Sequence, residues 1–263
     1  MGMGPGPADP QKVPYYLMIV GEPEEIPFKF QFQLDVQYAV GRLPFVTPKE
    51  LDIYARTVVA VEKGEITMPR DLAFFGAANQ DDRSTRLSTD HLVRPLAEHF
   101  TQTRPDWNVQ AHLEEAANRD RLTSLLGGEH TPSLLFSASH GMSFPNKDNR
   151  QLSHQGALLC SDWPGPREWK GSIPQDFYVA GDNLCSGDSP RGMISFFFAC
   201  YGAGVPRYDD FSKRAFSKKK EIAPHSFISD LPRRMLGHPG GGALAVVGYV
   251  DRTWGYSFFW APG

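Results

Sequence analysis

Short, almost unbroken apolar runs constrain the fold of this chain more than any other feature. Residues 131–139 (TPSLLFSAS), 192–199 (GMISFFFA) and 242–250 (GALAVVGYV) have strand length, and segments of helical character separate them. A strand that is apolar on both sides needs cover on both sides, which is typical of parallel sheets between helices. The pattern predicts an α/β fold with a mostly parallel sheet and helices on both faces.

The rest of the chain continues this alternation. Thr47, Pro48 and Glu50 favour a helix start, because Thr can cap, Pro suits the first turn and Glu suits the positive end of the helix dipole. We divide the chain into a Gly- and Pro-rich lead-in (1–14), an N-terminal α/β portion (15–66) and a main domain (67–263). Further strands are expected at residues 14–21, 37–45, 71–78, 107–113 and 156–162, and helices at 47–64, 88–100, 114–126, 173–184 and 226–237.

The composition argues against several classes of protein. The formal net charge of −3 gives no general attraction to nucleic acid, and the apolar runs are too short to cross a membrane. The N-terminus lacks the basic start and apolar core of a secretory signal. Three cysteines without a Cys-x-x-Cys pair fit neither a disulfide scaffold nor a structural zinc site. We expect a cytoplasmic protein without cofactor or metal, which binds neither nucleic acid nor membranes.

Two of the predicted strands end in chemically functional residues. One runs into His140 and Gly141, and another runs into Cys200. The carboxyl ends of parallel strands share one edge of a sheet, so this imidazole and thiol can face one cleft. A nearby imidazole activates a thiol, and the N–H groups of Gly141 and Cys200 can hold an oxyanion. The alternative is that Cys200 is a small buried hydrophobe and His140 a structural residue.

Both motifs together resemble a known family. FSASHG (136–141) and FFFACYGAG (196–204) are similar to the strand–His-Gly and strand–Ala-Cys signature of caspase-like (clan CD) cysteine peptidases, above all the gingipain-like and separase-like CHAT branch. The resemblance implies a caspase-hemoglobinase-like three-layer sandwich and a cysteine endopeptidase. It implies Cys200 as the nucleophile of an acyl-enzyme, His140 as the acid and base, and Gly141 and Cys200 as oxyanion donors.

The resemblance also implies selectivity for the residue before the scissile bond. Relatives place a pocket-floor residue in the loop that here contains Asp81 and Asp82, and an acidic floor favours Arg or Lys in the substrate. The alternative for these two aspartates is a capping or solvating role in the loop. Asp251 is a second acidic candidate for this substrate pocket, and Trp254 is a candidate for the pocket wall. Phe198 stands where caspases have Gln and metacaspases Asp, which argues against cleavage after Asp.

Other functions fit the same motifs. A catalytically silent caspase-like module would bind or regulate other proteins, and a transpeptidase would resolve the acyl-enzyme with an amine. The basic run at 207–220 is expected to be a solvated loop, with self-processing as the alternative. We interpret Cys160 and Cys185 as structural. Since the chain stops soon after its last strand, we expect a fragment of a larger protein. Its expected partners are a protein or peptide substrate and a regulatory sensor module.

Overall fold

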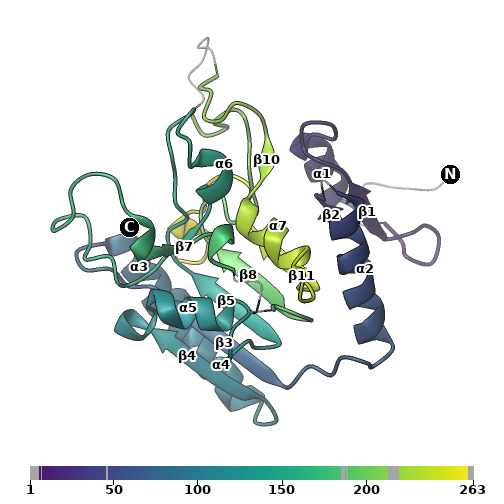
Figure 1. Ribbon diagram of the computed structural model, residues 1–263, viewed down its shortest axis with the longest axis horizontal. Helices are drawn as coiled ribbons and strands as arrows, with labels where there is room; N and C mark the ends of the chain where they lie inside the picture. Colours follow the sequence, from purple (N-terminus) through teal and green to yellow (C-terminus); the bar gives the residue numbers. More distant parts are fainter. Residues whose placement is uncertain are drawn as a thin grey trace.

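A five-stranded, all-parallel sheet forms the centre of the computed structural model, in the order β11-β8-β5-β3-β4 (Figure 1). The structure describes residues 6, 8–45, 47–184, 187, 189–212 and 219–259. The sheet confirms the α/β class and the parallel arrangement expected from the apolar runs. Its strands are β3 (Asp71–Gly76), β4 (Asn108–Leu113), β5 (Leu134–Ala138), β8 (Ile194–Phe198) and β11 (Ala245–Gly248).

Shorter strands and the helices surround this sheet. The strands outside it form three pairs, β1 (Tyr16–Val20) with β2 (Ala39–Leu43), β6 (Leu158–Leu159) with β7 (Tyr178–Val179), and β9 (Gly204–Val205) with β10 (Phe227–Ile228). The α-helices are α1 (Phe28–Asp35), α2 (Pro48–Glu62), α3 (Arg83–Ser88), α4 (Arg94–Thr103), α5 (Arg119–Leu125), α6 (Gln151–His154) and α7 (Asp230–Leu236).

Helices cover both faces of the sheet. Ala73 and Phe75 of β3 belong to one core cluster, which contains the buried leucines of α5 and α7. Leu72 and Phe74 belong to another cluster, which contains Ala97 of α4. Successive residues of a strand face opposite sides, so this division defines three layers of helix, sheet and helix (Figure 1).

The register of the sheet sets the position of the candidate site. Ala138 at the end of β5 lies opposite Phe198 at the end of β8. Continuing this register by two residues brings His140 opposite Cys200. β4 lies on one side of β3, whereas β5, β8 and β11 follow on the other side. The loops after β3 and β5 therefore meet at the point where strand order reverses, which is where open α/β sheets bind ligands.

Residues 15–66 form a small α/β unit beside the main sheet. A capping box opens α2 at the predicted start, with the Thr47 N–H donating to Glu50 Oε2 (3.1 Å) and the Glu50 N–H donating to Thr47 Oγ1 (3.3 Å). α2 is joined to the main domain, because the Tyr54 hydroxyl donates to the Leu244 carbonyl at 3.0 Å. The helix predicted at 47–64 is confirmed, while α1 was not predicted.

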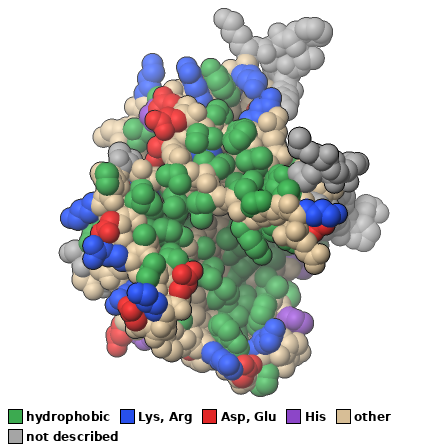
Figure 2. Space-filling view, turned by 90° about the vertical axis from the view of Figure 1, so that its right-hand side faces the viewer, with side chains coloured by type: hydrophobic (Ala, Val, Ile, Leu, Met, Phe, Trp, Pro, Cys, Tyr) green, Lys and Arg blue, Asp and Glu red, His purple; other side chains and the backbone are tan. Residues whose placement is uncertain are grey.

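One face of this N-terminal unit is apolar and uncovered. Tyr16, Met18 and Val20 alternate along β1 and are 83%, 55% and 60% exposed. Their neighbour Ile19 points the other way and is buried. Figure 2 shows hydrophobic side chains gathered over the side of the molecule on which this unit lies in Figure 1. The described residues therefore cover the β1–β2 pair on one face only.

The helix predicted at 173–184 is wrong. This segment contains two 3-10 turns, Gln175–Phe177 and Gly181–Asn183, on either side of β7. Tyr178, Val179 and Ala180 are all buried, although a surface helix buries only a stripe of its residues. Three consecutive buried residues and the pairing with β6 suit a short strand better.

Three other predicted helices differ in their bounds. The helix predicted at 88–100 begins at Arg83 and passes through a π-helical turn, Thr89–Val93, into α4, where Pro95 stands in the first turn. The segment 114–126 is divided, and Asn118 caps α5 by accepting the Arg121 N–H at 2.9 Å. The helix predicted at 226–237 begins only at Asp230, after β10.

Candidate active site

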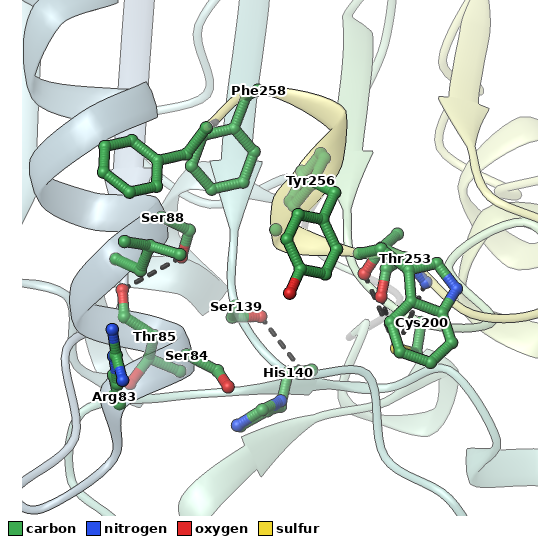
Figure 3. Close-up of a pocket in the computed structure, with 15 residues that line it drawn as sticks. Arg83, Ser84, Thr85, Ser88, Ser139, His140, Cys200, Thr253, Tyr256 and Phe258 are labelled. Atoms are coloured by element: carbon green, nitrogen blue, oxygen red, sulfur yellow. Dashed lines mark hydrogen bonds between the residues drawn. The ribbon is translucent and has the colours of Figure 1, made fainter. Parts of the chain in front are cut away.

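His140 and Cys200 line one cavity at the carboxyl edge of the sheet (Figure 3). The cavity has a volume of about 500 Å³. The first turns of α3, the ends of β5 and β8 and the loop after β11 enclose it. Its other lining residues are Arg83, Ser84, Thr85, Leu87, Ser88, Ser139, Phe198, Thr253, Trp254, Gly255, Tyr256, Phe258 and Phe259.

The tips of β5 and β8 touch each other through their backbones. The Ser139 N–H donates to the Phe198 carbonyl at 3.3 Å, which continues the ladder beyond the strands. At Gly141 an added Cβ atom would overlap the carbonyl oxygen of Cys200 and would lie 3.0 Å from its amide nitrogen. Only glycine fits such a close backbone approach, which explains the glycine after His140.

Thr253 holds the thiol of Cys200. Its N–H donates to Sγ at 3.4 Å, and its hydroxyl oxygen lies 3.5 Å from Sγ (Figure 3). Tyr201, the next residue, has a φ of 58°, so the chain bends sharply after Cys200 and leaves it at the tip of β8. Thr253 lies in the loop expected to supply Trp254, but its contact with the thiol was not predicted, because no sequence pattern marks it.

Asp82 holds the imidazole of His140. Its Oδ2 lies 2.5 Å from Nε2, and its Oδ1 caps α3 by accepting the Ser84 N–H at 2.9 Å. Burial raises the pKa of Asp82, but the hydrogen bond and charge of His140 and the N–H donors of α3 outweigh burial and hold this pKa below its ordinary value. The ionised Asp82 carboxylate therefore stabilises the folded protein. This stabilisation is fully present at pH values above the ordinary pKa of an unfolded Asp, and it is lost as the pH falls through the lowered pKa of the folded state.

The two ring nitrogens of His140 differ in their surroundings. Nε2 is bonded to Asp82, whereas no described residue forms a hydrogen bond with Nδ1. The imidazole points toward the start of α3 in Figure 3, and no hydrogen bond joins it to Cys200 in the described part of the chain. Catalytic hydrogen bonds are often absent before substrate binds, and Nδ1 is the nitrogen left to exchange a proton.

Two backbone N–H groups beside the thiol are free to bind an oxyanion. Gly141 lies at a bridge position opposite Leu158, where the flanking residues make the hydrogen bonds. The N–H groups of Gly141 and Cys200 donate to no described residue. The two amides lie close together, as the contact between these backbones requires. Paired, unused N–H groups of this kind can stabilise the oxyanion of an acyl-transfer intermediate.

The four residues predicted to bind substrate lie in different places. Trp254 lines the cavity and packs against Phe211, with ring centroids 5.5 Å apart. Asp82 is buried and bonded to His140 instead of forming a free pocket floor. Asp81 faces away from the cavity and pairs with Arg167 at 3.2 Å. Asp251 is buried outside the lining.

Asp251 connects two loops through its backbone. Its carbonyl accepts the Tyr201 N–H at 2.7 Å, and its N–H donates to the Gly204 carbonyl at 3.2 Å. Neither carboxylate oxygen has a hydrogen-bond partner among the described residues, and Arg252 Nε lies 3.8 Å away. Burial raises the pKa of Asp251, and the Arg252 charge only partly opposes this effect. The buried charge therefore costs stability at neutral pH.

We expect Asp251→Asn to raise the free energy of unfolding by about 1 kcal/mol at pH 7, because it removes a poorly solvated charge. Asn also tolerates the positive φ of 77° at this position. The gain should shrink as the pH falls through the raised pKa, where the native carboxyl becomes neutral. Urea unfolding of both proteins at pH 7 and pH 4 measures this difference. If Asp251→Asn protein were less stable than wild type by the same amount at pH 7 and at pH 4, the Asp251 carboxylate would not be destabilising.

Metal sites, membrane spans and the other cysteines are further features to consider in the described chain. No group of three or more potential metal ligands is found in it, and none of its helices is long and apolar enough to cross a membrane. Cys160 is fully buried, and burial raises the pKa of its thiol. Cys185 and part of the basic run at 207–220 lie outside the described residues.

Comparisons with known proteins add no family assignment. No protein-family model matches this chain, and neither a curated protein nor a solved structure was found to match it.

Proposed function

We propose that this chain is a cysteine endopeptidase with a caspase-like fold, which hydrolyses protein substrates through an acyl-enzyme on Cys200. One observation carries the proposal. Cys200 and His140 stand at the tips of two paired strands and line one cavity, and a buried carboxylate, Asp82, holds the imidazole. A nucleophile, a base and a group that orients the base form the usual constellation for acyl transfer.

The residues supply each step of this reaction. The Cys200 sulfur attacks the peptide carbonyl carbon while its proton passes to His140 Nδ1, and the N–H groups of Gly141 and Cys200 bind the oxyanion. The C–N bond then breaks, and the leaving amine takes the proton from Nδ1. Water attacks the thioester, gives a proton to Nδ1 and releases the acid. The thiol recovers that proton.

Asp82 acts as a positioning residue in this scheme. Its carboxylate accepts the Nε2 proton, which leaves Nδ1 as the nitrogen that can exchange a proton with the thiol and the substrate, and it stabilises the imidazolium that forms. The cap that Asp82 places on α3 fixes the carboxylate in turn. The sequence predicts a substrate contact for Asp82, with a capping role as the alternative, and the cap on α3 agrees with that alternative.

We expect Asp82→Asn to lower kcat on the order of 10²–10⁴-fold with little change in KM, because an amide can donate to Nε2 and favour the wrong tautomer. The matched control is Asp182→Asn. Asp182 Oδ2 lies 3.1 Å from His154 Nε2 in a second His–Asp pair that does not line the cavity. Steady-state hydrolysis of a labelled protein substrate measures both variants. Equal losses in the two variants would contradict a specific role for Asp82.

A catalytically silent module of the same fold is the second candidate. The observation that favours it is the separation of the dyad, since Thr253 contacts the thiol and Asp82 contacts the imidazole. Such a module would bind its protein partner without cleaving it. Hydrolysis that depends on both Cys200 and His140 would rule it out.

A further inference from the structure

Aromatic side chains form the apolar wall of the cavity beside His140 and Cys200. Among the described residues, Arg83 is the only Lys or Arg of its lining, and no acidic residue lines it. Arg83 is exposed and forms no ion pair with any of them. The apolar wall consists of Leu87 and five aromatic side chains, Phe198, Trp254, Tyr256, Phe258 and Phe259, while Ser84, Thr85, Ser88, Ser139 and Thr253 add hydroxyl groups to the lining.

The acidic side chains around the dyad already have cationic partners. Asp82 is bonded to His140, and Asp81 pairs with Arg167. On the far side of Cys200 a second hollow contains Asp209 and Glu221. Those two side chains pair with arginines as well, Arg252 and Arg207. Among the described residues, a basic substrate side chain would therefore meet no unpaired carboxylate in the lining of either hollow.

The acyl-enzyme on Cys200 defines which substrate side chain lies next to the thiol. The attacked carbonyl carbon becomes bonded to Sγ, and the side chain of the same residue is attached one bond further on. It must therefore occupy space that borders the thiol. The cavity shared with His140 borders it, and its volume of about 500 Å³ is within the usual range for bound small molecules. Apolar side chains gain most from such walls, whereas a charged one loses its hydration.

We propose that this cavity binds the side chain of the residue before the scissile bond and selects large apolar residues such as Leu, Met and Phe. This inference rests on the proposed peptidase function and replaces the Arg or Lys preference expected from the sequence. Arg83 adds to the selectivity, because its positive charge at the cavity disfavours a basic substrate side chain.

A peptide series tests this inference. Six fluorogenic peptides differ only in the residue before the cleaved bond, which is Phe, Leu, Met, Arg, Lys or Asp. The kcat/KM of wild-type protein is measured with each peptide. Peptidyl acyloxymethyl ketones with the same residues are used in parallel, and mass spectrometry follows the alkylation of Cys200. We expect the apolar members to react at least about 10-fold faster than the basic and acidic members in both assays.

Two substitutions of one exposed residue sharpen the test. Arg83→Glu places a carboxylate at the cavity and should improve the ratio of basic to apolar substrates at least about 10-fold, while Arg83→Gln only removes the positive charge and should keep the apolar preference. A wild-type preference for Arg, Lys or Asp, no preference, or an unchanged ratio in Arg83→Glu would overturn this inference alone. No hydrolysis and no alkylation of Cys200 with any member would overturn the peptidase function as well.

Discussion

Cys200→Ala protein should lose hydrolysis of a labelled protein substrate, with kcat/KM falling by about 10³-fold or more. The substitution removes the only atom that can form the acyl-enzyme, while binding and the oxyanion donors remain. Cys200 is only partly buried, so the folded structure should persist. The comparison is a progress curve at equal protein concentration, with circular dichroism to confirm that the variant is folded.

Cys160→Ala is the matched control for this experiment. Cys160 is buried in the core and lines neither hollow beside the dyad. Its removal should lower stability modestly through a small cavity and should leave kcat/KM unchanged. Activity that survives in Cys200→Ala, or disappears in Cys160→Ala protein that is folded, would contradict the choice of nucleophile.

Gly141→Ala is expected to remove activity and to lower the free energy of unfolding by about 3 kcal/mol or more. Its methyl group would overlap the Cys200 carbonyl oxygen, which is backbone and cannot rotate away. The tips of β5 and β8 would have to separate, and this movement displaces the imidazole, the thiol and both oxyanion donors together. Urea unfolding and substrate hydrolysis on the same preparation measure the two effects.

Gly187→Ala provides the matched control, because an added Cβ atom at Gly187 meets nothing within 4 Å. This variant should keep both stability and activity close to wild type. A Gly141→Ala protein that remains as stable and as active as Gly187→Ala would show that the two strand tips are not in contact, and the site as described would then be wrong.

The centre of the fold could be predicted from the sequence because its signal is local. Apolar runs of strand length such as ISFFF in β8 are typical of buried strands, and Thr47, Pro48 and Glu50 mark the start of α2. The positions of His140 and Cys200 at strand ends follow directly, since parallel strands share one carboxyl edge. The helix predicted at 173–184 is wrong because the composition of this segment is compatible with a helix, while its burial depends on tertiary contacts that no local pattern shows.

The partners of the dyad could not be predicted, for a different physical reason. The Asp82–His140 hydrogen bond joins residues 58 positions apart, and the Thr253–Cys200 contact spans 53 positions. Both depend on how loops fold back over the sheet edge, which residue spacing does not reveal. The sequence predicts His140 and Cys200 at one edge of the sheet, where the structure has them. For Asp82 it predicts a substrate contact or a loop cap, and the structure shows the cap together with an unpredicted bond to His140. It predicts no role for Thr253.

Mass spectrometry of the protein after reaction with peptidyl acyloxymethyl ketones tests the central claim most directly. These reagents lose a carboxylate when a reactive thiol attacks them, and they form a stable thioether. The account predicts one adduct per chain, located on Cys200, with a rate that falls in His140→Ala and Asp82→Asn proteins. An adduct on Cys160 or Cys185, or labelling of Cys200 at a rate independent of His140, would contradict it.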